Sequence, residues 1–130
     1  MDFIELFGHR QKIRKVGAAE VLFKEGDSGS ETFVVLEGAA EIWIGKTMVE
    51  LARPGGIVGE MALVDDDHRR SATVISRTPC QLVVLSQSDF DRLIRERPDF
   101  ARYVLKAVVE RLRHMNDNFL AGASSSGPGK

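Results

Sequence analysis

Residues suited to binding an anion gather in one segment of the chain, residues 54–73. Residues 60–64 can form a single helical turn, and the first turn of a helix carries backbone N–H groups that lack intrahelical partners. Such groups favour an anion, and Gly59 directly before them lets a ligand approach the main chain closely. The segment therefore predicts an anion site at the start of this turn.

Arg70 and Ser71, near the end of the same segment, add side chains that suit a phosphate. The guanidinium of an arginine is a planar fork that matches phosphate oxygens, and a serine hydroxyl is a further donor. The carboxylate of Glu60 would oppose an anion unless it contacts another part of the ligand, and a sugar hydroxyl is the natural donor to it. A phosphate together with a ribose hydroxyl indicates a nucleotide.

Short strands separated by glycines must position this segment. Glycines recur at short intervals as far as Gly59, between runs of β-branched and aromatic residues, as in an antiparallel sandwich or barrel. Gly45-Lys46 is expected to form the two-residue turn of a hairpin. The expected strands are residues 12–16, 21–23, 32–36, 41–44, 47–51, 72–76 and 81–85.

Two helices are expected after the strands. Ser88 and Asp91 have the spacing of an N-terminal capping box, with Asp in place of the preferred Glu, and predict a short helix. Pro98 suits the first turn of a longer helix, in which apolar residues recur every three or four positions from Phe100 to Phe119. Its opposite face carries a mixed set of charges that we expect to be solvated: Arg102, Lys106, Glu110, Arg111 and Arg113.

The two ends of the chain differ from this pattern. Asp2, Glu5 and the apolar residues after them predict a short N-terminal helix that ends near Gly8. Residues 121–130 are small, polar and rich in glycine, which predicts a flexible tail or a remnant of an expression tag after a domain of residues 1–120.

Composition excludes several classes of protein. At 130 residues one domain is expected, and 18 basic against 19 acidic residues leave a net charge of −1, without bulk attraction to nucleic acid or anionic membranes. No apolar run is long enough for a membrane span, and no signal peptide is present, so we expect a cytoplasmic protein. The single cysteine, Cys80, excludes an internal disulfide and a thiolate metal site.

The central segment resembles the phosphate-binding cassette of the cyclic nucleotide-binding domain, a family that includes bacterial catabolite activator protein, protein kinase regulatory subunits and cyclic-nucleotide-gated channels. The resemblance is carried by Gly59-Glu60-Met61-Ala62-Leu63 and Arg70-Ser71-Ala72-Thr73. Weaker matches surround it: residues 20–27 look like the opening strand and turn of the family, 33–38 like its next strand, and 89–112 like its closing helices.

This resemblance implies a role for each residue of the cassette. It assigns Glu60 to the ribose 2′-hydroxyl and Arg70 to the exocyclic phosphate oxygens, with Ser71 joining the phosphate. The main chain at Gly59, Met61 and Ala62 supplies further polar contacts. Many family members carry the arginine one residue nearer the Gly-Glu pair, which would select Arg69, but the Arg-Ser-Ala-Thr context favours Arg70. Serine after this arginine, where members selective for cyclic GMP often have threonine, favours cyclic AMP (cAMP) over cyclic GMP (cGMP).

Other interpretations of these residues remain open. Glu60 and Arg70 could form an ion pair that closes a surface loop, in a family member that has lost its ligand. Residues 65–67 are acidic but lack the spacing of a calcium loop, and the three histidines are too far apart for a metal site. Cys80 is expected to be a small, partly buried residue.

The sequence thus predicts a mainly β protein with flanking helices: an antiparallel, jelly-roll-like β-roll with a short N-terminal helix, a one-turn phosphate-cassette helix and two C-terminal helices. We expect a regulatory sensor of cAMP, or of cGMP, that has no enzymatic activity, cofactor or metal and transmits occupancy through its C-terminal helices. Only about two helices follow the strands, which is too little for a helix-turn-helix domain, so direct DNA binding is not expected. Their partner would be another protein, or the parent channel, kinase or transporter if the chain is a fragment. The alternative is a β-roll that binds a protein partner and no nucleotide.

Overall fold

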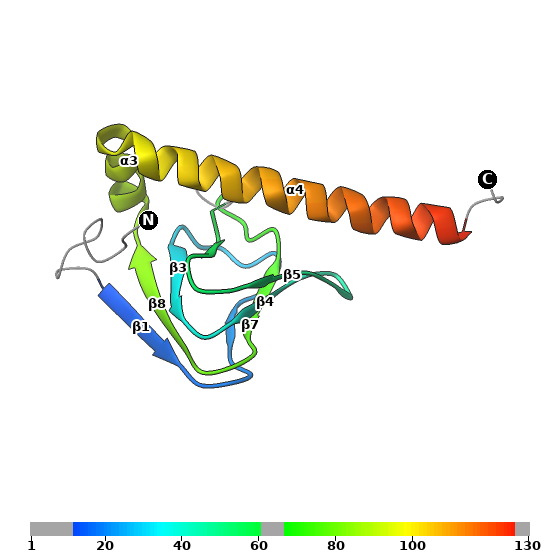
Figure 1. Ribbon diagram of the computed structural model, residues 1–130. Coiled ribbons are helices and arrows are strands. Elements are labelled where there is room, and N and C mark those ends of the chain that lie inside the picture. Colours follow the sequence, from blue (N-terminus) through cyan, green and yellow to red (C-terminus); the bar gives the residue numbers. More distant parts are fainter. Residues whose placement is uncertain (1–11, 61–66, 127–130) are drawn as a thin grey trace.

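The fold was analysed in a computed structural model of the chain, which describes residues 12–60 and 67–126, with side chains as far as residue 117. Strands alternate with tight turns along most of this length, and two helices follow them (Figure 1). The elements are β1 (Lys12–Val16), β2 (Val21–Phe23), β3 (Thr32–Glu37), β4 (Ala40–Ile44), β5 (Thr47–Ala52), β6 (Ile57–Val58), β7 (Thr73–Ser76), β8 (Cys80–Leu85), α3 (Gln87–Glu96) and α4 (Pro98–Ser126).

The strands form two antiparallel sheets of four strands each. One has the order β1-β8-β3-β6 and the other the order β2-β7-β4-β5. Apart from the β4–β5 pair, neighbouring strands are distant in sequence, so the chain crosses repeatedly between the sheets, as in a β-roll. The predicted mainly β architecture is confirmed.

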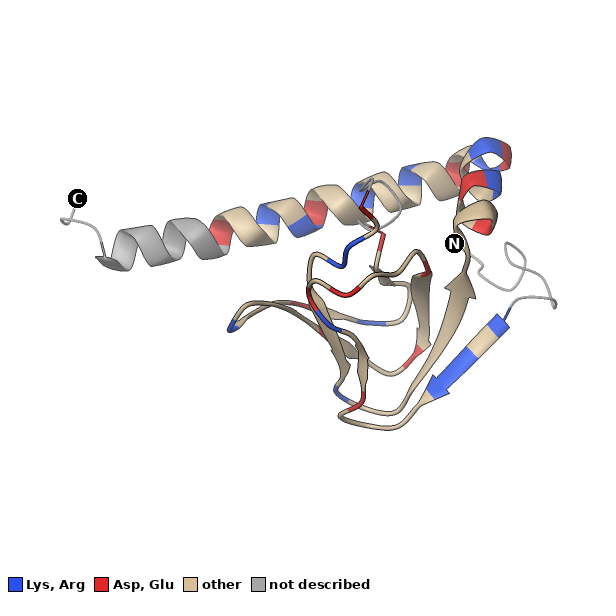
Figure 2. Ribbon diagram, turned by 180° about the vertical axis from the view of Figure 1, so that it is seen from behind, with Lys and Arg blue, Asp and Glu red and all other residues tan. Residues whose placement is uncertain are grey.

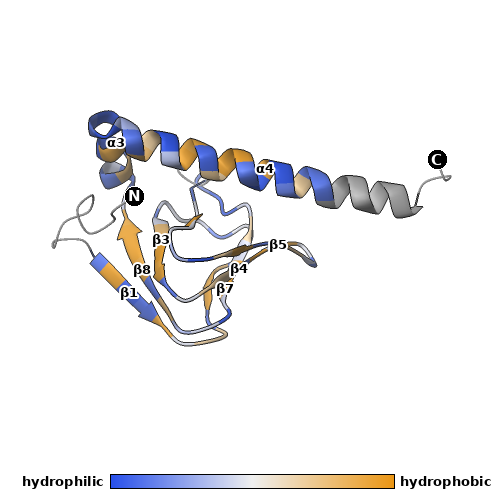
Figure 3. Cartoon of the chain, in the orientation of Figure 1, coloured by the Kyte–Doolittle hydropathy of each residue, from blue (hydrophilic) through white to orange (hydrophobic). Residues whose placement is uncertain are grey.

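Within the β1-β8-β3-β6 sheet, the inner strands β3 and β8 are largely buried on both faces, which explains their continuous apolar runs (Figure 3). Successive side chains of a strand point to opposite faces. Phe33 and Val35 of β3 therefore enter the core between the sheets, whereas Val34 joins a second core beneath the helices. The second core also contains Val83, Leu85, Phe90, Leu93, Phe100 and Val104.

Helix α3 begins two residues earlier than its sequence signal indicated. Its N-cap is Ser86, whose hydroxyl accepts a hydrogen bond from the Asp89 amide at 3.1 Å, while the Asp89 carboxylate accepts one from the Ser86 amide at 3.2 Å. The expected capping box at Ser88 and Asp91 was therefore wrong in position. The capping box forms directly after β8, which ends at Leu85. Ser86 has the extended backbone of an N-cap residue, with φ −71° and ψ 168°.

Helix α4 lies along one side of the roll and continues past it (Figure 1). Phe100 at its start packs edge-on against Phe90 of α3, with ring centroids 5.8 Å apart. The helix extends to Ser126, beyond residue 120, where the sequence analysis ended the domain. A flexible tail at residues 121–130 stays a prediction.

The structure contains the expected β4–β5 hairpin and one short strand that was not expected. Gly45 has φ +59° in the β4–β5 turn, which confirms the hairpin. The short strand β6 was missed, because two residues between glycines carry no alternation. Phe33 is a core residue, whereas Trp43 is half-buried and its Nε1 donates a hydrogen bond to Glu41. The segment expected to form an N-terminal helix and residues 61–66 of the cassette lie outside the described residues. In the part of the chain that is described, no helix has the length and apolar character needed to cross a membrane.

Candidate functional site

Gly59 and Glu60 directly follow β6, at the edge of the first sheet. Gly59 has φ +84°, a conformation that side chains disfavour. A Cβ atom on Gly59 would also lie 2.7 Å from Nη1 of Arg70 and 3.0 Å from the carbonyl oxygen of Glu31. Glycine is therefore required here both for the turn and for the close approach of Arg70.

Arg70 is positioned by main-chain pairing with the turn that follows β2. The Arg70 amide donates to the carbonyl of Asp27 at 2.8 Å, and the Gly26 amide donates to the carbonyl of Arg70 at 2.8 Å. A further bond joins the Gly29 amide to the carbonyl of His68 at 2.9 Å. These bonds turn the Arg70 side chain inward, where it is only 6% exposed.

The guanidinium of Arg70 is buried without a carboxylate partner among the described residues. Its Nη1 donates to the carbonyls of Glu31 at 2.7 Å and Gly59 at 3.2 Å, and the group stacks over Phe23 at 4.2 Å. Its Nε is buried and has no hydrogen-bond partner within residues 12–60 and 67–117. Burial lowers the pKa of Arg70, and the charges of Glu31, Asp27 and Glu60 offset this only in part. A buried cation with a vacant donor is suited to an anionic ligand.

Glu60 is also buried, but its partner comes from α4. Its Oε1 accepts a hydrogen bond of 2.5 Å from Nη1 of Arg111. Arg111 also donates from Nε and Nη2 to the two oxygens of Glu50 on β5, both at 2.9 Å, and from Nη2 to the carbonyl of Ile57 at 2.6 Å. These contacts join α4, β5 and the end of β6 at one point.

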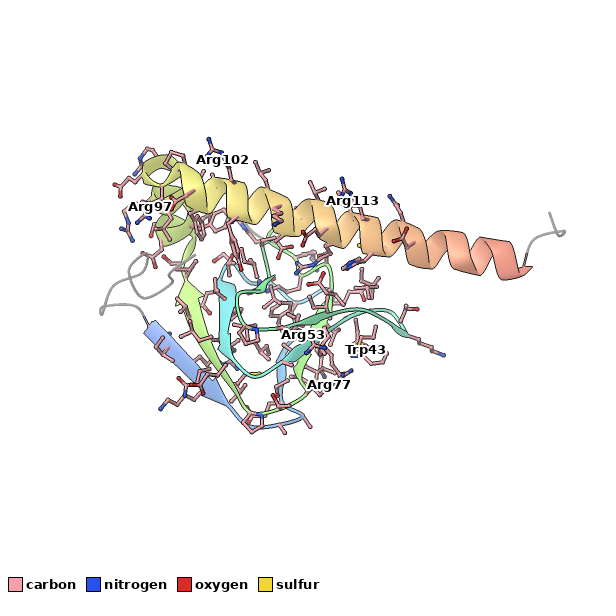
Figure 4. All side chains as sticks on the ribbon, in the orientation of Figure 1. Trp43, Arg53, Arg77, Arg97, Arg102 and Arg113 are labelled. Atoms are coloured by element: carbon pink, nitrogen blue, oxygen red, sulfur yellow. The ribbon has the colours of Figure 1, made fainter. Side chains whose placement is uncertain are left out.

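The expectation that Arg111 belongs to a solvated face was wrong. Its side chain is 13% exposed and turned toward the sheets, whereas Arg102 and Arg113 point away from them (Figure 4). A signal was present in the sequence: Val104, Val108, Arg111 and Met115 follow the four-three-four spacing of one helix face. Charged residues are spread over the coloured part of α4 in Figure 2, so composition alone did not distinguish Arg111 from the solvated set.

The surroundings of Arg111 affect its pKa in two directions. Burial lowers the pKa of Arg111, but the hydrogen bond with Glu50 and the charges of Glu60 and Glu50 outweigh burial and raise it overall. Arg111 is therefore a satisfied cation, in contrast to Arg70.

A cavity of about 180 Å³ lies between the roll and α4, with Gly59, Glu60, Arg70 and Arg111 at its polar end. Ser71 also lines it. The remaining wall is almost entirely apolar and consists of Phe23, Ile42, Ile44, Val49, Val58, Ala72, Val74, Val108, Leu112 and Met115. The site thus combines a paired carboxylate and a vacant cation with a surface suited to a flat, apolar group.

Four of the six residues predicted from the sequence meet at this cavity: Gly59, Glu60, Arg70 and Ser71. Met61 and Ala62 lie outside the described residues. The alternative arginine, Arg69, is exposed and donates to the carbonyl of Gly26 at 3.3 Å.

The alternative interpretation, an ion pair between Glu60 and Arg70, is not what the structure has, since Glu60 pairs with Arg111. Within residues 12–60 and 67–117, no cluster of acidic, histidine or cysteine side chains could hold a metal ion.

Comparison with known proteins identifies the family. The profile described as "Cyclic nucleotide-binding domain" matches residues 13–97, so the chain belongs to the cyclic nucleotide-binding domain family. The match covers α3 and all of the β-roll except its first residue, Lys12.

Several relatives carry this domain within longer chains. The chain is 36% identical over 100 residues to the cyclic nucleotide-gated potassium channel mll3241 of Mesorhizobium japonicum, covering 77% of this chain and 27% of the channel. It is 30% identical over 122 residues to the Pycsar effector protein PaPycTIR of Pseudomonas aeruginosa, covering 89% of this chain and 40% of the effector. The chain thus spans well under half the length of these curated relatives.

A solved structure has a similar fold over most of its own length. It comes from work on a cyclic-GMP-dependent signalling pathway that regulates bacterial phytopathogenesis, and it is 27% identical with a TM-score of 0.71. The alignment covers 85% of this chain and 91% of that one. The similar chains therefore include a channel, an effector and a protein from the study of a signalling pathway.

Proposed function

We propose that this chain is a sensor domain that binds cAMP at the cavity between the β-roll and α4, and that its role is regulatory and not catalytic. In this proposal Arg70 binds the cyclic phosphate, Glu60 accepts a hydrogen bond from the ribose 2′-hydroxyl, and the apolar wall holds the base. Ser71 and the main chain at Gly59, Met61 and Ala62 complete the polar contacts.

The observation that carries the proposal is the state of Arg70. Arg70 is 6% exposed and its Nε has no hydrogen-bond partner among the described residues, although an unpaired buried donor is costly. An anion at the polar end of the cavity would supply both the missing acceptor and the missing charge. A cyclic phosphate carries one negative charge, which matches the single positive charge of Arg70.

The choice of cAMP rests on the apolar wall of the cavity and on Ser71. Most of its wall is apolar, which favours the face of a purine. Ser71, which follows the phosphate arginine, supports cAMP over cGMP by the family resemblance described above. A panel of the 3′,5′-cyclic monophosphates of the four common bases will rank the ligands.

Occupancy would be transmitted through α4, because this helix contributes both apolar wall and Arg111 to the site. A ligand shifts a conformational equilibrium only by binding its two states with different affinity. Contacts of the ligand with Glu60 and with Val108, Leu112 or Met115 provide that difference if α4 moves relative to the roll. What α4 then acts upon is a protein partner, or the rest of a longer chain.

Arg70→Ala tests the site directly. We expect the substitution to cost about 2 to 5 kcal/mol of binding free energy, because it leaves a desolvated phosphate unpaired. Isothermal titration calorimetry with cAMP measures the loss. Arg69→Ala is the matched control: it removes a neighbouring arginine that is exposed, and its affinity should stay close to that of the wild type. Equal affinities in Arg70→Ala and the wild type would contradict the proposal.

Exposed apolar side chains on α4 favour a second candidate, a β-roll that binds a protein partner without nucleotide. Leu105, Val109 and Leu112 are 65%, 44% and 54% exposed. This function would be favoured if none of the cyclic nucleotides bound while the purified domain formed a stable dimer in light scattering that Leu105→Lys abolished.

A further inference from the structure

Arg111 is held from two sides by carboxylates on different elements, Glu50 of β5 and Glu60 after β6. All three side chains are largely buried, with 13% of Arg111, 18% of Glu50 and 8% of Glu60 exposed. A pairing of this kind is far more specific in geometry than a surface ion pair.

Glu50 makes the more extensive of the two contacts. Its carboxylate accepts from Nε and Nη2 of Arg111 in the parallel, bidentate arrangement, with both bonds at 2.9 Å. With the bonds to Glu60 and to the carbonyl of Ile57, four of the five N–H groups of the guanidinium are used. Glu50 therefore fixes the plane of the guanidinium, and one Nη1 hydrogen reaches Glu60 within that plane.

We propose that Glu50 is a positioning residue for the ligand site: by holding Arg111 in a bidentate pair, it sets the Glu60 carboxylate for a ribose 2′-hydroxyl and ties α4 to the occupied site. The inference rests on the proposed function, because it concerns the same ligand contact at Glu60. It adds a residue that does not line the ligand cavity and acts only through Arg111.

Charge explains why a second carboxylate is needed. An arginine paired with Glu60 alone would neutralise it and compete with the ligand hydroxyl for its oxygens. With Glu50 present, the three charges sum to −1, so Arg111 is already neutralised and Glu60 keeps acceptor strength. Arg111 then orients Glu60 through Oε1, and in this proposal Oε2 receives the ribose hydroxyl.

The pair also connects the ligand contact to the elements around it. Glu50 lies on β5, the edge strand of the second sheet, and Arg111 lies on α4. When the ribose hydroxyl binds Glu60, the cluster made by Glu50, Arg111 and Glu60 therefore links the ligand to a strand and a helix at once.

The test compares cAMP with 2′-deoxy-cAMP, which lacks only the hydroxyl in question. Dissociation constants for both ligands are measured by calorimetry in the wild type, in Glu50→Gln and in the control Glu41→Gln. Glu41 is a glutamate of the neighbouring strand β4 that pairs with Arg77 at 2.8 Å, outside the cavity. The wild type and Glu41→Gln should bind the deoxy ligand about tenfold or more weakly than cAMP.

In Glu50→Gln, the dissociation constant of 2′-deoxy-cAMP should exceed that of cAMP by less than about threefold. Both ligands should still bind, and Arg70→Ala should still weaken their binding. A merely structural role for Glu50 would weaken both ligands equally and leave the ratio unchanged, which would overturn the inference. If Glu50→Gln does not fold, Glu50→Asp gives the same comparison, because its shorter side chain cannot hold Arg111 and Glu60 in the same arrangement. If cAMP did not bind the wild type, or bound Arg70→Ala equally well, the proposed function would be overturned, and this inference with it.

Discussion

Two buried arginines face the candidate cavity, and their surroundings give them different roles. Arg111 has two carboxylate partners and a raised pKa, so its charge serves to hold elements together. In the part of the chain that the structure describes, Arg70 has only carbonyl partners and an Nε without an acceptor, and its pKa is lowered by burial. Only Arg70 has both the charge and the donor available for an anion.

Space for the Arg70 guanidinium is left by a glycine in the turn that pairs with it. A Cβ atom on Gly29 would lie 2.7 Å from both Nε and Nη2 of Arg70. The side chain cannot easily move away, since it is fixed by Phe23 and by two carbonyls. Gly29 is therefore part of the site although it makes no ligand contact in our proposal.

Gly29→Ala should displace the guanidinium and weaken cAMP binding by about tenfold or more, while the folded domain persists. Gly17→Ala is the matched control, because a Cβ there meets only Oε1 of Glu20, at 3.3 Å. Affinity is measured by calorimetry and folding by circular dichroism. Unchanged affinity in a folded Gly29→Ala protein would show that Arg70 adapts freely.

At the scale of elements, the junction between β8 and α3 sets where α4 can begin. The capping box at Ser86 and Asp89 ends the strand and starts the helix within one residue. Phe90 and Leu93 of α3 then enter the same core as Phe100 and Val104 of α4. The direction of α4 along the roll thus depends on a cap that is far in sequence from Arg111.

Ser86→Ala should lower the free energy of unfolding by about 1 kcal/mol, the usual cost of losing an N-cap hydroxyl. The hydrogen bond with Ser86 lowers the pKa of Asp89, so the contribution of Asp89 is present above its unfolded pKa of about 3.9 and is lost as the pH falls through the folded value. The difference in free energy of unfolding between the wild type and Ser86→Ala should therefore become smaller below about pH 4. Urea denaturation at pH 7 and pH 3 measures it, and a difference that grew in acid would contradict this account.

At the scale of the whole molecule, one sheet is covered by the second sheet on one face and by the helices on the other. The candidate cavity lies where these layers meet, lined by both sheets and by α4. A ligand in that place contacts all three layers, so binding should stabilise the fold as a unit.

Saturation with cAMP at 100 times its dissociation constant should add about 2.7 kcal/mol and raise the melting temperature by several degrees. Differential scanning fluorimetry of the purified chain measures the shift, and Arg70→Ala should show none. A shift of equal size in the variant would mean that the nucleotide binds elsewhere.

The elements themselves could be predicted from the sequence because their signals are local. Strands β1 and β2 have the expected bounds, and the remaining longer strands and the two helices differ from expectation by a few residues at their ends. Alternation, glycine turns and helical spacing depend on a few neighbouring residues, so they can be recognised in the sequence before the fold is known. Gly59, Glu60, Arg70 and Ser71 could be selected because one short segment contains them all.

Only the tertiary structure decided which partners these residues meet. The pairing of Glu60 with Arg111, and of Arg111 with Glu50, joins residues 51 and 61 positions apart. The space that Gly29 leaves for Arg70, and the inward turn of Arg70 instead of Arg69, likewise follow from pairing between distant turns. Local sequence determines the conformation of each element, whereas burial and charge pairing between elements depend on how the layers pack, and that packing gives the two arginines their separate roles.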